Sequence, residues 1–246
     1  MTIRIEQVSM QYGAVKALSG VTIHAPSSTI VGIIGANGAG KTTLFKCIRG
    51  EQRLASGYVF LDDILVSAMS PTRIGRSGIS GSSQTPLLSE ELTIEENLSV
   101  ARYAPGAWRR GHLKRSQSRQ RVADALEVFG LRAVAKEFTS EAPYAIKKIA
   151  DVARAFARKS RLVLLDEPCA GVDEKRKEAL VTGIQHFCAL DRSTVMLIEH
   201  DLAFIARLAE EIHALDSGTL VASGSYAKVT GDKRVRAAFL GWNAES

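Results

Sequence analysis

The segment GANGAGKT at Gly35–Thr42 restricts what this chain can be more than any other part of the sequence. It matches the pattern G-x-x-x-x-G-K-[ST], and it lies between an apolar run at Ile30–Ile34 and a helix-forming stretch that starts after Thr42. Glycines in such a loop let successive backbone N–H groups turn inward onto phosphates, and the following helix directs its positive end at them. The segment therefore predicts a loop that binds ATP.

The side chains of this loop indicate how the phosphates are held. We expect Lys41 to place its ammonium group on the β and γ phosphates and the Thr42 hydroxyl to ligate Mg²⁺. The residues of the loop predicted to bind ATP are Gly35, Asn37, Gly38, Ala39, Gly40, Lys41, Thr42 and Thr43.

An acidic pair after a second apolar run, RLVLLDEP at Arg161–Pro168, supplies what such a site still needs. Asp166 is predicted to hold Mg²⁺ through water, and Glu167 is the candidate catalytic base. The alternative is an acidic pair that ends a strand and caps a helix.

His200 follows the next apolar run, where open α/β sheets place their ligands, so we expect it to orient the γ-phosphate or the attacking water rather than to be structural.

Composition agrees with one α/β domain. The chain has 246 residues, 46% of them hydrophobic and 24% charged, and no apolar run of about twenty residues that could span a bilayer. Three widely spaced cysteines fit a reducing cytosol. The net charge of +6 suits an anionic partner, and much of it lies in Arg109–Arg121, which we interpret as a solvated face, with lipid headgroups or nucleic acid as alternatives.

The periodicity of the sequence changes twice along the chain. Short β-branched runs fill the first third, including IRIEQVSM, GVTIHA and STIVGIIG. Helical periodicity dominates from about Pro86 to Lys159, opening with SEELTIEENLSVARY on an N-cap serine. Two apolar strands then flank a helix from about Asp173 to Leu190, and a hairpin around Ser217-Gly218 and a last helix near Lys233–Leu240 follow.

In this order the motifs resemble the ATP-binding subunits of ABC transporters, and most closely those that serve uptake of branched-chain amino acids and urea. The resemblance covers nearly the whole chain. It rests on MQYGAVKAL, GANGAGKTTLFKCIRG, SSQTPLL, ARAFA, LVLLDEPCAGVD, LIEHDL and the ending AAFLGW.

The resemblance implies roles for two residues that the pattern alone would make structural, Tyr12 as a core aromatic and Gln84 as a loop residue. Tyr12 matches the aromatic residue that stacks on adenine, and Gln84 matches the glutamine that touches Mg²⁺ or the catalytic water and senses the permease. It also makes Glu167 the catalytic base and His200 the switch histidine. Gly171-Val172-Asp173 matches the loop that reaches across to the partner domain. The predicted metal ligands are therefore Thr42, Gln84 and Asp166.

One motif departs from the family. Where these proteins carry Leu-Ser-Gly-Gly-Gln or a close variant, this chain reads Ala142-Pro143-Tyr144-Ala145-Ile146. Pro143 offers neither a hydroxyl nor an N–H, and Ala145 limits close backbone approach, although a helix can still start here. We expect the ATP that meets this segment in the partner's loop to be hydrolysed poorly. A heterodimer with a different ATP-binding subunit follows as a hypothesis.

The resulting prediction is an α/β P-loop NTPase fold of the ABC type, with an N-terminal antiparallel β-subdomain and an inserted α-helical subdomain. A single nucleotide-binding domain would span residues 1–246, with its core at 1–85 and 161–246 and its helical subdomain at 86–160. The expected partners are a second ATP-binding subunit, two membrane permease subunits and, indirectly, a substrate-binding protein, with no nucleic acid. The expected location is peripheral, on the cytoplasmic face of the cell membrane.

The expected function is ATP hydrolysis that powers uptake of branched-chain amino acids, urea or similar small amides. Two alternatives inside the family are a regulatory or structural subunit with weak hydrolysis and the ATPase of a lipopolysaccharide-type exporter. Outside the family, a soluble GTPase is disfavoured because the chain has no Asn-Lys-x-Asp segment to read guanine. An ATPase acting on nucleic acid is disfavoured because most non-transport relatives have two domains in tandem and this chain has one.

Overall fold

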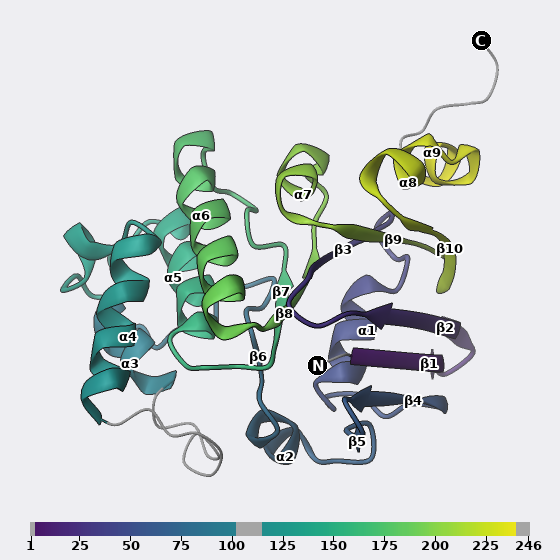
Figure 1. The fold of residues 1–246 in the computed structure, drawn as a ribbon, viewed down its shortest axis with the longest axis horizontal. Coiled ribbons are helices and arrows are strands. Elements are labelled where there is room, and N and C mark those ends of the chain that lie inside the picture. Colours follow the sequence, from purple (N-terminus) through teal and green to yellow (C-terminus); the bar gives the residue numbers. More distant parts are fainter. Residues whose placement is uncertain (1–2, 102–114, 240–246) are drawn as a thin grey trace. The chain divides into compact units, whose positions relative to one another are not determined.

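The computed structural model describes residues 3–101 and 115–239. Contacts within the chain separate two units. The first unit comprises Met1–Ile74 and Thr194–Ser246, and the second comprises Gly75–Ser193. Figure 1 shows the elements of both units, and each unit is described by itself.

The first unit contains the predicted antiparallel sheet, with strand order β2-β1-β4-β5. Its strands are β1 (Ile3–Tyr12), β2 (Val15–Ala25), β4 (Ser56–Leu61) and β5 (Ile64–Leu65). Along β1 the buried residues alternate with more exposed ones, as expected for a sheet with one face packed on the core. The β1–β2 hairpin closes at Tyr12, which pairs with Val15.

The same unit contains a second set of strands, in the order β10-β9-β3-β8. They are β3 (Ile30–Ile34), β8 (Thr194–Ile198), β9 (Glu211–Asp216) and β10 (Thr219–Gly224). β3 runs parallel to both β8 and β9, and every residue of β3 and β8 is buried, which explains their continuous apolar sequences. Because Ile33 pairs with Ile198, the carboxyl ends of β3 and β8 lie at one edge.

Four helices described in the first unit lie wholly within it. They are α1 (Lys41–Ile48), α7 (Leu202–Leu208), α8 (Tyr226–Gly231) and α9 (Lys233–Phe239). α2 (Pro71–Arg76) starts in this unit, whose first segment ends at Ile74. The helix predicted after the glycine loop is α1, and Gly50 follows it with a positive φ of 70°, as a helix-ending glycine requires.

The second unit places a short parallel strand pair beside a group of helices. Figure 1 shows α4, α5 and α6 alongside one another. The elements are β6 (Ile79–Gly81), β7 (Leu162–Asp166), α3 (Ile94–Val100), α4 (Arg115–Val128), the 3-10 turn η2 (Arg132–Val134), α5 (Tyr144–Phe156) and α6 (Glu174–Asp191). Phe129, Phe156 and Phe187 stack between the helices, with ring centroids 5.7 to 5.9 Å apart.

The predicted N-cap serine of the first helix in this unit is wrong. α3 begins at Ile94, and Thr93 caps it by accepting the Glu96 N–H, while Glu96 reaches back to the Thr93 N–H. The sequence offers Ser89 and Thr93 as caps, and only Thr93 has a glutamate three residues later to complete a capping box. The N–H of Ser89 is instead bonded to the Asn97 side chain.

The basic stretch Arg109–Arg121 is only partly a solvated face. Residues 109–114 lie outside the described part of the chain. Arg121 is buried, forms an ion pair with Asp191, and donates to the Phe156 carbonyl at 2.8 Å. This arginine therefore holds helices together and is not available to lipid or nucleic acid.

Candidate functional site

The glycine loop between β3 and α1 adopts a backbone that only glycine tolerates. Gly35 and Gly40 have φ angles of 152° and 99°. A Cβ on Gly35 would lie 2.2 Å from the Leu215 carbonyl oxygen, and one on Gly40 would lie 2.5 Å from the Ala17 carbonyl oxygen. The loop is therefore packed against β2 and β9, which fixes the course of its N–H groups.

Lys41, the first residue of α1, is almost fully buried and folds back over the loop. Its Nζ donates to the Gly35 carbonyl at 2.7 Å and the Ala36 carbonyl at 2.9 Å. Thr42 and Thr43 are half-buried in the first turn of α1, which contains no acidic residue. Asn37 and Gly38 are exposed and Ala39 is buried. A cationic, acid-free helix start of this kind suits a phosphate.

The β9–β10 turn braces the loop, a role that the sequence did not predict. Gly218 donates its N–H to the Ala39 carbonyl at 3.1 Å and accepts from the Ser19 N–H at 2.8 Å. This glycine therefore connects the loop to β2. The only signal in the sequence was its place in a predicted hairpin.

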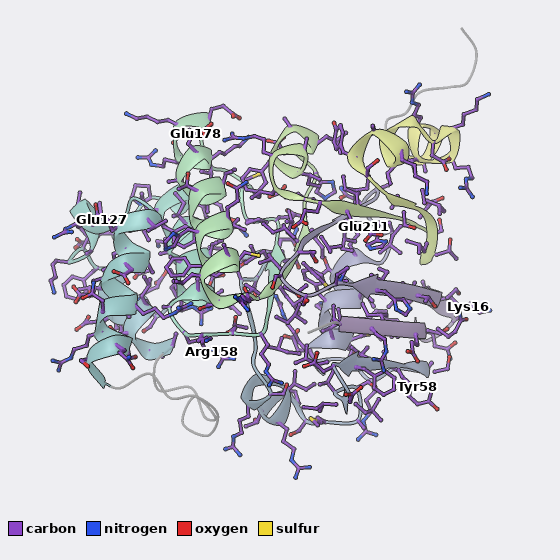
Figure 2. The ribbon with its side chains drawn as sticks, viewed as in Figure 1. Lys16, Tyr58, Glu127, Arg158, Glu178 and Glu211 are labelled. Carbon is purple, nitrogen blue, oxygen red and sulfur yellow. The ribbon has the colours of Figure 1, made fainter. Side chains whose placement is uncertain are left out.

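Tyr12 lies at the tip of the β1–β2 hairpin, with 43% of its surface exposed. Figure 2 labels Lys16, which is paired with Gln11 at this tip. One residue further along β2, the Ala17 carbonyl is the group that Gly40 packs against. An accessible aromatic ring thus lies on the strand pair that supports the glycine loop, where it can stack on a base.

His200 follows β8 and is exposed, with its backbone N–H bonded to the Glu199 side chain at 3.0 Å. Asp201 then caps α7 by accepting the Phe204 N–H. Since β8 pairs with β3, His200 and the glycine loop leave the same edge of one parallel strand pair. The structure therefore confirms that His200 lies just after the end of a strand.

In the second unit, Asp166 ends β7 and is 2% exposed. Glu167 comes next and adopts a φ of 50°, in the left-handed region that residues other than glycine seldom occupy. Such strain is concentrated at functional positions. The turn breaks the alternation of strand side chains, so Asp166 and Glu167 are not forced to opposite faces.

Gln84, three residues after β6, meets Glu167. Its Nε2 donates to the Glu167 Oε1 at 3.3 Å, and both side chains belong to the second unit. The structure thus brings together two residues that the sequence separates by about eighty positions. Tyr12, the glycine loop and His200 belong to the first unit.

The segment Gly171-Val172-Asp173 leads into α6. Asp173 caps this helix by accepting the Arg176 N–H at 3.0 Å. Its carboxylate also accepts from the Arg176 guanidinium, and this hydrogen bond holds the pKa of Asp173 below its ordinary value. The segment therefore ends on a charged, well-anchored cap.

Pro143 is the N-cap of α5, and no side chain caps this helix. Pro143 and Tyr144 are exposed, and no acidic residue lies in the first turn. The expectation that a helix can start here despite the proline is confirmed. Its positive end is retained, whereas the hydroxyl group of the usual motif is missing.

Two further residues contact this part of the second unit without having been predicted. Lys148 and Asp151 are fully buried on α5; Lys148 donates to the Gln84 carbonyl, and Asp151 accepts the Ser83 N–H. The sequence predicted only the helix that carries them. Their one sequence signal is the presence of charges within the apolar periodicity of α5.

Comparison with known proteins agrees with this geometry. Residues 18–170 match the family model described as ABC transporter. The chain is 29% identical to the high-affinity branched-chain amino acid transport ATP-binding protein LivG of Escherichia coli (strain K12), over 96% of both chains. It is 30% identical to the methionine import ATP-binding protein MetN 3 of Pseudomonas fluorescens, over 98% of this chain and 74% of that protein.

Solved structures give the same answer for the fold. An ATP-binding cassette of an ABC transporter in its ADP conformation superposes with a TM-score of 0.84 at 25% identity, covering 98% of this chain and 100% of the other. In the described residues no helix is long and apolar enough to cross a bilayer. The chain belongs to the ABC transporter family, and it is an ATP-binding subunit that couples ATP hydrolysis to transport and works with membrane permease subunits.

Proposed function

We propose that this chain hydrolyses the ATP held in its own glycine loop, with Glu167 as the base that activates water. The contact between Gln84 and Glu167 at 3.3 Å carries this proposal. The Gln84 amide can orient a water molecule, and the Glu167 carboxylate can accept the proton of that water. The strained φ of Glu167 sets the direction in which its carboxylate leaves the backbone. His200 then contacts the γ-phosphate, and Tyr12 stacks on adenine.

Mg²⁺ is the metal that fits the proposed ligands. Thr42, Gln84 and Asp166 offer hydroxyl, amide and carboxylate oxygens, the hard donors that Mg²⁺ prefers. When bound, this ion neutralises charge on the β and γ phosphates. Lys41 supplies a second positive charge at the loop, and it exchanges the Gly35 and Ala36 carbonyls for phosphate oxygens.

Replacing Glu167 by Gln tests the assignment of the base. Glutamine preserves the size and the contact with Gln84 but cannot accept a proton from water, so we expect hydrolysis to fall by about 10²- to 10⁴-fold with ATP binding unchanged. The matched control is Glu174→Gln, an exposed acid in the first turn of α6. Wild-type turnover in Glu167→Gln would remove Glu167 from the chemistry.

The proposed assembly is a heterodimer with a second, different ATP-binding subunit on two permease subunits, at the cytoplasmic face of the membrane. Pro143 and Ala145 support it, because Pro143, the N-cap of α5, has neither a hydroxyl nor an N–H to offer a partner's nucleotide at the place of the usual serine. The site that includes this segment then hydrolyses ATP slowly, and the site in this chain's loop works with the partner's intact motif.

Mutating one subunit at a time within the co-purified transporter tests this asymmetry. We expect Glu167→Gln in this chain to remove most of the turnover, while the same change in the partner removes little. Pro143→Ser combined with Ala145→Gly restores donors and backbone access, so it should raise turnover at the slow site by roughly tenfold or more. Equal ATPase activity of the chain alone and of the mixed pair would contradict the heterodimer.

The proposed solute class is branched-chain amino acids, urea or similar small amides. The name of the LivG relative supports branched-chain amino acids. The methionine-import relative shows that similar chains serve other amino acids as well. Radiolabelled uptake by the reconstituted transporter, with leucine, urea and methionine as competing solutes, tests it. Export of a lipid-linked sugar instead of uptake would overturn this assignment.

A further inference from the structure

Helix α5 buries two charged side chains one turn apart. Lys148 and Asp151 are both 0% exposed. Residues three apart lie on the same helix face, and burying a charged group is costly unless it is fully hydrogen-bonded. The hydrogen-bond partners of Lys148 and Asp151 therefore show which part of the structure these buried charges hold in place.

Lys148 binds three backbone carbonyls at once. Its Nζ lies 2.9 Å from the Ser83 oxygen, 2.8 Å from the Gln84 oxygen and 3.1 Å from the Asp166 oxygen. An ammonium group has three N–H donors, which matches the number of these acceptors. The acceptors belong to two segments of the chain, one after β6 and the other at the end of β7.

Asp151 holds the peptide group on the other side of Ser83. Its Oδ2 accepts the Ser83 N–H at 3.1 Å, and its Oδ1 accepts from Arg154 at 2.6 Å. A third constraint comes from the strand pair, where the Ser82 N–H donates to the Leu164 carbonyl at 3.0 Å. Ser83 is thus fixed at both its N–H and its carbonyl.

The hydrogen-bonded backbone groups lie next to Gln84 and Glu167, the two residues proposed to orient and activate water. Gln84 contributes its own carbonyl to Lys148, and Glu167 follows the Asp166 carbonyl with a strained φ of 50°. Strained conformations persist only where the surroundings over-determine them. One ammonium group thus ties together the two backbone segments whose side chains meet at 3.3 Å.

We propose that Lys148 is a positioning residue for ATP hydrolysis, which clamps the Gln84 and Asp166 backbones so that Gln84 and Glu167 stay in reach of each other. This inference rests on the proposed roles of Gln84 and Glu167. A purely structural lysine that only anchors α5 would make the same contacts. The two roles differ in whether the effect of Lys148 passes through Gln84.

The first experiment compares Lys148→Met with Lys147→Met in the co-purified transporter. Methionine preserves most of the volume and removes the charge and all donors. Lys147 is the adjacent lysine, and its contacts are an ion pair with Glu90 and a long bond to the Ser140 carbonyl. We expect kcat to fall about 10- to 100-fold in Lys148→Met only, with the KM and Kd for ATP within about twofold of wild type.

The second experiment is a double-mutant cycle with Gln84→Ala. If Lys148 acts by positioning Gln84, Lys148→Met should cost much less in the Gln84→Ala background than in wild type. An equal loss in both backgrounds, or no loss in wild type, overturns the proposal. Lys148→Arg keeps the charge but cannot converge three donors from one atom, so it enters the same cycle if the methionine variant does not fold.

Glu167→Gln in the same complex separates this inference from the proposed chemistry. Loss of turnover in Glu167→Gln with wild-type turnover in Lys148→Met overturns only the positioning role. Wild-type turnover in Glu167→Gln overturns the proposed base itself. Thermal unfolding of each variant shows whether a loss of kcat comes with a loss of fold.

Discussion

At the scale of single residues, the glycines of the nucleotide loop differ in how much space they leave for a side chain. A Cβ on Gly40 would meet the Ala17 carbonyl oxygen at 2.5 Å, whereas one on Gly38 would meet nothing within 4 Å. Both have a positive φ, so alanine costs roughly 1–2 kcal/mol of backbone strain at either position. Only at Gly40 must the backbone of β2 also move.

We therefore expect Gly40→Ala to weaken ATP binding and to lower the unfolding temperature more than Gly38→Ala does. Calorimetric titration with ATP and thermal unfolding of the two variants measure this difference. Equal losses in both would mean that the packing against β2 does not shape the loop.

His213 on β9 is a buried histidine that the proposed reaction does not use. Its ring is 4% exposed, its Nε2 lies 3.7 Å from the Glu211 Oε1, and neither ring nitrogen has a hydrogen-bond partner among the described residues. Burial, with a smaller contribution from His24, lowers the pKa of His213 from 6.5 to about 4. Between these two values the unfolded chain binds more protons than the folded chain, so the folded state loses stability as the pH falls.

The free energy of unfolding should fall by roughly 2 kcal/mol from about pH 7 to about pH 5 because of His213 alone. His213→Phe removes this contribution, so the variant should lose less stability over that range than wild type. Urea unfolding at the two pH values measures both. An identical pH dependence in the variant would show that His213 is not the group that titrates.

At the scale of elements, the Arg121–Asp191 pair joins α4 to the end of α6. The two side chains are 8% and 4% exposed, and Arg121 also lies over the Phe187 ring at 5.0 Å. Removing one partner leaves an uncompensated buried charge, which typically costs about 3–5 kcal/mol, whereas replacing both partners can be nearly neutral.

Arg121→Met should therefore destabilise the chain by about 3–5 kcal/mol, and Arg121→Met combined with Asp191→Leu should recover most of that loss. Urea unfolding of the two variants measures the recovery. Arg119→Met, at an exposed position of α4, is the control and should change stability by less than about 0.5 kcal/mol. A double variant as unstable as the single one would contradict the pairing.

The sequence was most informative about elements whose pattern has a single explanation. β3, β7 and β8 are unbroken apolar runs, and the glycine loop between β3 and α1 has a fixed pattern, so their type and order were predicted. β6 has three residues, two of them Ser80 and Gly81, and it carried no comparable signal. Lys147 and Lys148 are adjacent lysines, and only the packing of α5 decides which is buried.

At the scale of the whole molecule, the two units carry different parts of the proposed machinery. The glycine loop, Tyr12 and His200 lie in one unit, and the Gln84–Glu167 pair lies in the other. At the start of α5, Pro143 stands where the family has a serine, so its position offers a partner's nucleotide neither a hydroxyl nor an N–H. Nucleotide binding is therefore expected of the isolated chain, and full turnover only of the complete transporter.

The most direct test is calorimetric titration of the purified chain with ATP and Mg²⁺. We expect one saturable site per chain, and Lys41→Ala should weaken ATP binding by about tenfold or more, because this substitution removes the charge expected to contact phosphate. Lys46→Ala, at the exposed end of α1, should bind as wild type does. No saturable heat with the wild-type chain, or equal affinity in Lys41→Ala, would show that this loop does not bind ATP.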